Sequence, residues 1–390
     1  MAWRPWTVEE RWLVFAGSLG VAVAAFYACG DDDSRAATDE TPDAGTGANA
    51  SCERSDDADR HTADVVEAAN AFLTALTAEQ RTAASYERTL TNAQKWSNFP
   101  TTFVQRNGVA LGELSEAAQG AAIALAEVAA GETGAKLLDE LREADEFLVT
   151  DGKAASSDYG RGLYFFSIHG TPSTDAAWLL QIGGHHHAYN FTYAGKCTSA
   201  TPLFDGVEPT TWTDGDGEEH APLEVQRASM VALLAAVSDN ADAKLSGTFS
   251  DLVNGPTGGP GGGSGGDTNY PDSLDYPTGT TGRGVKVGTL TAANQALVKT
   301  AIEAWAKNVA EPVSRALLDV YESDAALADT YVGYSGSADL TTQASYVRID
   351  GPRVWIEVTV QGGIVYRDHV HFHTIWRDKA ADYGAEYASQ

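Results

Sequence analysis

The chain has 390 residues, of which 43% are hydrophobic and 9% aromatic, so it can build a substantial core. Its 54 acidic and 26 basic residues give a formal charge of -28, which repels nucleic-acid phosphates and anionic lipid head groups. We therefore expect no nucleic-acid partner, and we expect membrane contact only through the N-terminal segment.

Residues 1–29 have the features of an export signal. Residues 12–28 are almost free of charge, and they end in Phe26-Tyr27-Ala28-Cys29. This tetrapeptide resembles the lipobox of bacterial lipoproteins, in which the cysteine is lipidated after cleavage. The alternative is an uncleaved membrane anchor of marginal length. Both interpretations place the protein in the bacterial cell envelope, membrane-anchored, with its body in the periplasm or outside the cell.

Residues 30–59 predict a disordered acidic tether, because they contain almost no large apolar side chain that could enter a core. Residues 60–390 then form the body, which we predict to be a single large globular domain. Cys52 and Cys197 are the cysteines that remain after Cys29, and an exported compartment permits a disulfide between them.

Within the body, the spacing of apolar residues predicts helices and strands in an irregular order. In chain order, we predict helices over 63–76, 114–129 and 135–147, strands over 164–168, 178–182 and 190–193, a helix over 223–245, a Gly- and Pro-rich mobile loop over 254–266, helices over 291–308 and 312–328, and strands over 345–349, 354–360 and 369–376. Because strands and helices do not alternate regularly, we expect an α+β fold with a helical layer packed on a mixed or antiparallel sheet.

Six of the nine histidines fall in two tight groups, and the C-terminal group has strand periodicity. A strand would present His369, His371 and His373 on one face, where two or three imidazoles could bind a transition metal. His371 and His373 are the better pair, since His369 would lie at the strand mouth. The carboxylates of Asp368, Asp378 and Asp382 are candidates to fix the imidazole tautomers. The alternative is a solvent-facing strand that happens to contain histidine.

The upstream group, Gly183-Gly184-His185-His186-His187, needs a different argument. In a regular strand, His185 and His187 would share one face and His186 would point to the other. A bend or bulge after the two glycines could direct two adjacent imidazoles at one point. The alternative is a structural histidine cluster beside a turn.

Several motifs together are shared with a known family. They are Gly184-His185-His186 followed by Asn190-Phe191-Thr192, and His371-Phe372-His373 followed by Arg377-Asp378 and Asp382-Tyr383-Gly384. Over roughly residues 90–385, the chain resembles the DUF3500 family of uncharacterised bacterial proteins. The resemblance implies His185, His186, His371 and His373 as the metal ligands, with His187 and His369 as lesser candidates. It implies no activity.

An all-imidazole ligand set favours copper or zinc over magnesium or calcium as the cofactor. Copper would suggest an oxidoreductase that acts on a small molecule with dioxygen or peroxide. Zinc would suggest a hydrolase with Asp378 or Glu357 as the base. Arg377 is either a structural partner of a carboxylate or an anion clamp. A surface lipoprotein without catalysis, which binds a metal ion or small ligand or uses its histidines only structurally, is the alternative from another class.

Overall fold

The computed structural model describes residues 56–195, 197–246, 252 and 276–387. All of them belong to one compact unit. The predicted signal segment, residues 30–55 of the predicted tether and the predicted loop at 254–266 lie outside the described residues. Among the residues described, no helix combines the length and apolar character that a membrane span requires.

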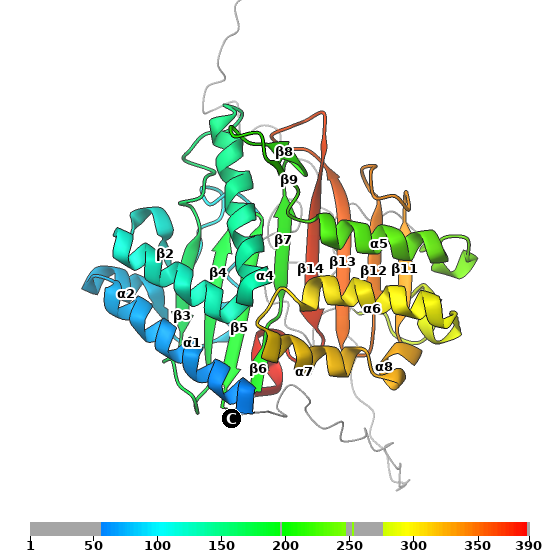
Figure 1. The fold of residues 1–390 in the computed structure, drawn as a ribbon, viewed down its shortest axis with the longest axis horizontal. Helices are drawn as coiled ribbons and strands as arrows, with labels where there is room; N and C mark the ends of the chain where they lie inside the picture. The colour runs from blue at the N-terminus through cyan, green and yellow to red at the C-terminus, as the bar shows by residue number, and fades with distance from the viewer. Residues whose placement is uncertain (1–55, 196, 247–251, 253–275, 388–390) are drawn as a thin grey trace, which may run out of the picture. The chain divides into compact units, whose positions relative to one another are not determined.

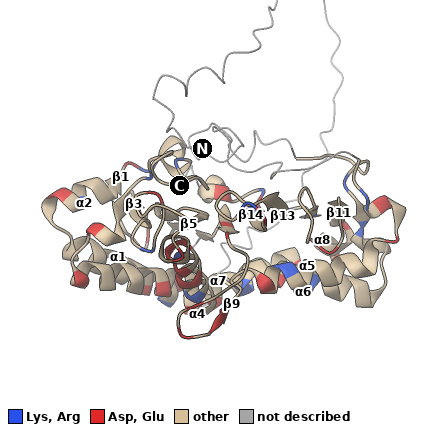
Figure 2. Cartoon of the chain, turned by 90° about the horizontal axis from the view of Figure 1, so that it is seen from above, with Lys and Arg blue, Asp and Glu red and all other residues tan. Residues whose placement is uncertain are grey.

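Most of the helices gather on one side of a broad sheet (Figures 1 and 2), whereas the short α3 packs with the apolar cluster on the other side. The helices are α1 (Asp56–Ala75), α2 (Ala78–Ala84), α3 (Leu90–Ala93), α4 (Glu116–Thr150), α5 (Glu224–Val237), α6 (Ala292–Ala306), α7 (Glu311–Tyr321) and α8 (Asp324–Ala328). Most begin at a Ser or Thr that accepts a hydrogen bond from the first turn, such as Ser115 before α4 and Thr291 before α6. These caps fix where the helices start above the sheet.

The strands form one large sheet and a separate hairpin. They are β1 (Ser85–Tyr86), β2 (Val109–Ala110), β3 (Phe165–His169), β4 (Trp178–Gly184), β5 (His187–Ala194), β6 (Cys197–Ser199), β7 (Leu203–Val207), β8 (Trp212–Thr213), β9 (Glu219–His220), β10 (Val285–Lys286), β11 (Tyr331–Ser335), β12 (Tyr346–Asp350), β13 (Val354–Gly362) and β14 (Val370–Asp378).

In space, the sheet runs β1-β3-β4-β5-β7-β14-β13-β12-β11-β10, with β2 beside β3, β6 beside β5, and β8 and β9 apart as the hairpin. The β1–β3 pair is parallel, and the other neighbours in the sheet are antiparallel. The predicted α+β architecture, a helical layer on a mixed sheet, is therefore confirmed. The ladder between β7 and β14 joins the strands of the first half of the chain to those of the second half.

Several details differ from the predicted elements. The helix predicted over 312–328 is divided into α7 and α8, and the helix predicted over 223–245 ends at Val237. The helices expected over 114–129 and 135–147 are halves of α4, which bends at Gly131, where φ is 68°. The strands β7 and β11 were not predicted, because Asp205, Gly206 and Gly333 interrupt their apolar runs. Both strands are nevertheless buried along their whole length.

The two faces of the sheet differ in chemistry. On β14, Thr374 lies on the helix side, because Trp305 of α6 donates a hydrogen bond to its Oγ1 at 2.8 Å. His371 and His373 therefore lie on the opposite face, since neighbouring residues of a strand point to opposite sides. We call this opposite side the polar face. The main apolar core lies between the helices and the sheet. A smaller apolar cluster on the polar face contains Trp96 and Tyr383.

Candidate metal centre

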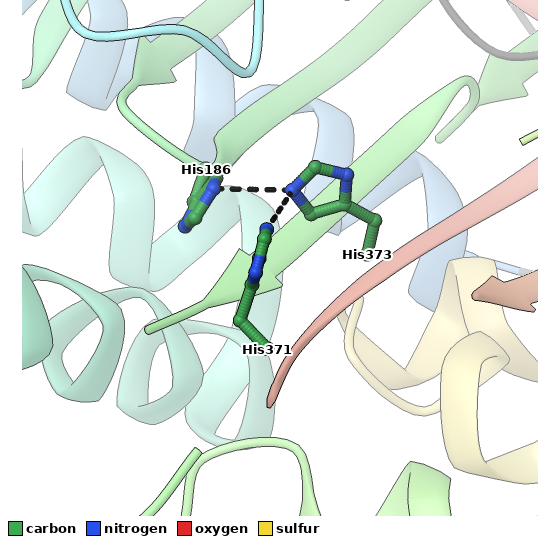
Figure 3. A group of neighbouring side chains, drawn as sticks. All are labelled: His186, His371 and His373. Carbon is green, nitrogen blue, oxygen red and sulfur yellow. Dashed lines mark hydrogen bonds between the residues drawn. The ribbon is translucent and has the colours of Figure 1, made fainter. Parts of the chain in front are cut away.

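Three imidazoles from distant parts of the chain meet on the polar face (Figure 3). His371 and His373 come from β14, and His186 comes from the turn between β4 and β5. The Nε2 atom of His373 lies 3.1 Å from Nε2 of His371 and 3.1 Å from Nε2 of His186. The three ligand nitrogens all lie within 4.8 Å of one another. We call this group the histidine triad.

The spacing of the triad suits one metal ion. Tetrahedral zinc with Zn–N bonds of about 2.05 Å separates two ligand nitrogens by about 3.3 Å. The two observed separations of 3.1 Å are close to that value. Within the described part of the chain, the group contains imidazole nitrogens only. Three protein ligands leave the fourth position of a four-coordinate ion open. The triad could therefore hold a metal ion that also binds water or a substrate.

The triad is buried, and the pKa values of His186 and His371 are lowered. The exposed fraction is 6% for His186, 1% for His371 and 3% for His373. Burial, reinforced by the neighbouring His373 and His185, lowers the pKa of His371 to about 2. Burial also lowers the pKa of His186 well below its ordinary value, and the adjacent imidazoles lower it further. An imidazole without a proton on its ligand nitrogen binds a metal without first losing a proton.

Two glycines make room for the turn that presents His186. A Cβ at Gly184 would lie 2.8 Å from ring atoms of Tyr164. A Cβ at Gly206, which pairs with His373 across the β7–β14 ladder, would lie 3.0 Å from both His186 Cγ and His373 Cδ2. The N–H of Gly206 also donates to the carbonyl oxygen of His186 at 2.7 Å. Gly206 therefore holds the turn by its backbone and leaves space for two imidazoles.

A buried arginine fixes the other side of the same turn. Arg106 donates through Nη2 to the carbonyl oxygen of Gly184 at 2.9 Å and to that of Ser97 at 2.7 Å. It also donates to the carbonyl oxygens of Phe99 and Val104. One guanidinium thus ties the irregular segment 97–106 to the end of β4, and it uses the fixed fork of donors that arginine offers.

Comparison with known proteins assigns the family. A sequence model described as "Protein of unknown function (DUF3500)" matches residues 58–385. The chain belongs to the DUF3500 family. The matched region contains the whole triad, both glycines of the turn and Arg106. The comparisons find no match among curated proteins and none among solved structures.

The other predicted histidines of this DUF3500 protein lie outside the triad. His185, predicted as a fourth ligand, has its Nδ1 2.7 Å from Asp145 Oδ1. Its ring stacks on that of His186 with the centroids 3.7 Å apart. His187 has its Nδ1 2.8 Å from Asp205 Oδ1. His369 is exposed. Sequence reasoning thus named the three triad members, and the structure places His185 beside them.

Asp378, proposed as a base, and Asp382, proposed to fix an imidazole tautomer, are hydrogen-bonded elsewhere in the protein. Asp378 accepts hydrogen bonds from the Tyr321 hydroxyl at 2.8 Å and from Arg353 Nε at 3.0 Å. Arg377 donates to Asp382 at 2.6 Å in a buried pair. These contacts join β14 to α7, to residue 353 and to the C-terminal turn. They fit a structural role for Arg377, and they give neither Asp378 nor Asp382 a contact with the triad.

Glu357 is also part of a hydrogen-bonded network. It lies on β13 and accepts from the Tyr346 hydroxyl and from Trp355 Nε1, each at 2.7 Å. The residue is completely buried, so these two donors compensate for the water that the carboxylate loses. Glu357 pairs with Ile375 across the β13–β14 ladder, and the next pair on the same face is Thr359 with His373.

Sequence reasoning missed the two carboxylates that do contact the histidine segments, Asp145 and Asp205. One signal was present for Asp145. It lies four residues after Leu141 and three before Leu148, so it falls within the apolar stripe of α4, where an unpaired carboxylate would be unfavourable. Asp205 offered no such signal, because β7 was not recognised as a strand.

The structure describes only one of the two cysteines of the predicted disulfide. Cys197, at the start of β6, is buried and disulfide-bonded. The predicted partner, Cys52, lies outside the described residues, as does the predicted lipidation site, Cys29. The pairing of Cys52 with Cys197 stays a prediction.

Proposed function

We propose that this DUF3500 protein is a metalloprotein whose cofactor is one transition-metal ion bound by His186, His371 and His373. The observation that carries the proposal is the convergence of three buried imidazoles, in which Nε2 of His373 lies 3.1 Å from Nε2 of both His186 and His371. Imidazole ligands favour copper or zinc over magnesium and calcium, which prefer oxygen. A structural zinc site fills all four positions, whereas a catalytic site keeps one open, as three ligands would here.

Our first candidate function is a copper-dependent oxidoreductase that acts on a small molecule. Copper(II) stands above zinc in the affinity order for nitrogen ligands. A bound copper ion would supply electron transfer to dioxygen or peroxide. The carboxylates considered as hydrolytic bases, Asp378 and Glu357, are already hydrogen-bonded within structural networks, and this favours oxidation over base-assisted hydrolysis.

The second candidate is a zinc-dependent hydrolase. It is favoured by the match between the observed Nε2 separations of 3.1 Å and the geometry of tetrahedral zinc. A bound zinc ion would supply a nucleophilic water at neutral pH, without a carboxylate base beside it. A surface lipoprotein that binds metal without catalysis would keep the same triad but would turn over no substrate.

Elemental analysis tests the metal site. The full chain is purified in detergent without a histidine tag, exposed to Cu²⁺ or Zn²⁺ and dialysed. We expect about one metal ion per chain, its loss in His373→Ala, and its retention in the control His369→Ala, which removes an exposed histidine near the same strand. A wild-type chain that retains neither metal would refute the proposal. With copper bound, the paramagnetic resonance spectrum should show nitrogen coupling.

We further propose that the body is anchored in the cell envelope through a lipid on Cys29. The support is the lipobox-like sequence at residues 26–29 and the acidic, apolar-poor stretch that follows it. Bacteria that express the chain with a radiolabelled fatty acid should label the wild type and not Cys29→Ser. Label that persists in the variant would show that Cys29 is not the lipidation site.

A further inference from the structure

Two buried Asp–His pairs flank the triad member His186 in the sequence. Nδ1 of His185 lies 2.7 Å from Asp145 Oδ1, and Nδ1 of His187 lies 2.8 Å from Asp205 Oδ1. The side chains of both pairs are at most 5% exposed. Asp145 comes from α4 and Asp205 from β7, so two different elements hold the residues on either side of His186.

The backbone of His186 is in a conformation that requires such support. Its φ is 56°, in the left-handed region that a residue with a side chain seldom adopts. The residue belongs to a two-residue turn, because β4 ends at Gly184 and β5 begins at His187. A strained conformation at a functional position persists only when its surroundings fix it.

The surroundings of His186 fix both its peptide and its ring. The ring of His185 stacks on the ring of His186 at 3.7 Å, and Tyr159 packs edge-on against the ring of His185 at 4.7 Å. The imidazole of His185 is therefore held between Tyr159 and His186, while Asp145 fixes its rotation. On the other side, Asp205 holds His187 and is followed by Gly206, whose N–H binds the His186 carbonyl.

We propose that Asp145 and Asp205 are positioning residues of the metal centre, which hold His186 in the left-handed conformation that points its Nε2 at His373. This inference rests on the proposed metal site and assigns it two groups that do not contact the metal. Mutation of a group that hydrogen-bonds to a metal-ligating histidine typically lowers the metal affinity 10- to 100-fold. We expect an effect of this order here, because Asp145 and Asp205 fix the two residues next to His186. Without either one, His186 can relax to an ordinary turn and leave His371 and His373 as a two-nitrogen site.

The test measures Co²⁺ affinity in the full chain after its metal is removed with a chelator. Co²⁺ is chosen because its visible absorption reports both binding and ligand geometry. We expect Asp145→Ala and Asp205→Ala each to raise the Kd on the order of 10- to 100-fold and to weaken the tetrahedral absorption band. Asp145→Asn and Asp205→Asn keep an oxygen that can accept from the histidine N–H, so we expect them to recover part of the lost affinity.

The chain offers a matched control, since Asp214 forms a partly exposed pair with His220 at 3.3 Å in the β8–β9 hairpin. Asp214→Ala should leave the Kd unchanged. If either alanine variant does not fold, the asparagine variant at that position is measured instead, and we expect its Kd to be higher than that of the wild type. Wild-type affinity in folded Asp145 and Asp205 variants would overturn the inference. Wild-type affinity in His373→Ala would instead overturn the metal site itself.

Discussion

Gly206 has a hydrogen where other residues have a side chain, and this leaves room for the imidazoles of His186 and His373 to approach each other. A methyl group there would lie 3.0 Å from carbon atoms of both His186 and His373, closer than ordinary contacts allow. Because a metal site tolerates displacements of only about 0.5 Å, even a small shift of the rings should matter.

We predict that Gly206→Ala weakens Co²⁺ binding by roughly tenfold or more, since both rings must move to accommodate the methyl group. The control is Gly215→Ala, because a Cβ at Gly215 would meet no atom within 4 Å. Both variants are titrated with Co²⁺ under the same conditions. Equal affinity in the two would show that the rings can shift without loss of ligation.

A second residue-level prediction concerns His169, which ends β3 and is not a member of the triad. Burial and, to a lesser extent, the charge of Lys95 lower its pKa to about 4. When the pH falls below the ordinary value of about 6.5, the unfolded chain gains a proton at this residue while the folded chain does not. Between pH 7 and pH 5, the titration of His169 should therefore lower the free energy of unfolding by about 2 kcal/mol.

The free energy of unfolding in urea, measured at pH 7 and pH 5 with a chelator present, tests this expectation. The wild type should lose more stability between the two pH values than His169→Gln, because glutamine does not titrate. The same loss in both proteins would contradict this expectation, because it would mean that the pKa of His169 is the same in the folded and the unfolded state.

At the scale of elements, α4 links the metal centre to the helical layer, because it contributes Asp145 and packs on the segment after α6. Its close approach depends on Gly134, where a Cβ would lie 2.1 Å from the carbonyl oxygen of Asn308. Gly120, in the same helix, is exposed, and a Cβ there would meet nothing within 4 Å. The two glycines thus occupy opposite environments in one helix.

We predict opposite effects of alanine at these two positions. Gly134→Ala should lower the free energy of unfolding by at least about 2 kcal/mol, because helix and neighbouring backbone must separate. Gly120→Ala should raise it by up to about 1 kcal/mol, through the higher helix propensity of alanine. Urea denaturation of both variants measures the difference. A stabilising Gly134→Ala would contradict the packing described for α4.

The sequence predicted the elements that have a clear period, and it predicted the part of the site that follows from such a period. His371 and His373 share a face because strand residues alternate, so their convergence could be read from spacing. The role of His186 could not, because its direction depends on one positive φ within a two-residue turn. Asp205 and Gly206 could not be predicted as site residues, because they interrupt the apolar run by which β7 would have been recognised as a strand. Their partners are set by tertiary contacts alone.

At the scale of the molecule, the triad bridges the two halves of the sheet. His186 belongs to the half that contains β4 and β5, whereas His371 and His373 belong to the half that contains β13 and β14. In the sheet, the halves meet at the ladder of β7 and β14. A metal ion bound to all three residues would therefore add a second connection across the same boundary.

We predict that metal stabilises the whole fold through this connection. With free Co²⁺ at about 100 times its Kd, the free energy of unfolding should rise by about 2.7 kcal/mol, provided that the unfolded chain does not bind the ion. His373→Ala should show no such rise, and a chelator should reverse it in the wild type. Stabilisation of His373→Ala by the same amount would place the bound ion elsewhere.

The order of the chain along the triad has a consequence for biogenesis. His186 emerges during synthesis long before β14, and an isolated imidazole on an unfinished chain has neither of its two partners. Capture of a metal ion by all three imidazoles would therefore wait until β14 has docked beside β7. The centre would mature as a late event that discriminates finished molecules from fragments, so the metal content of a preparation would report the fraction of chains folded through to β14.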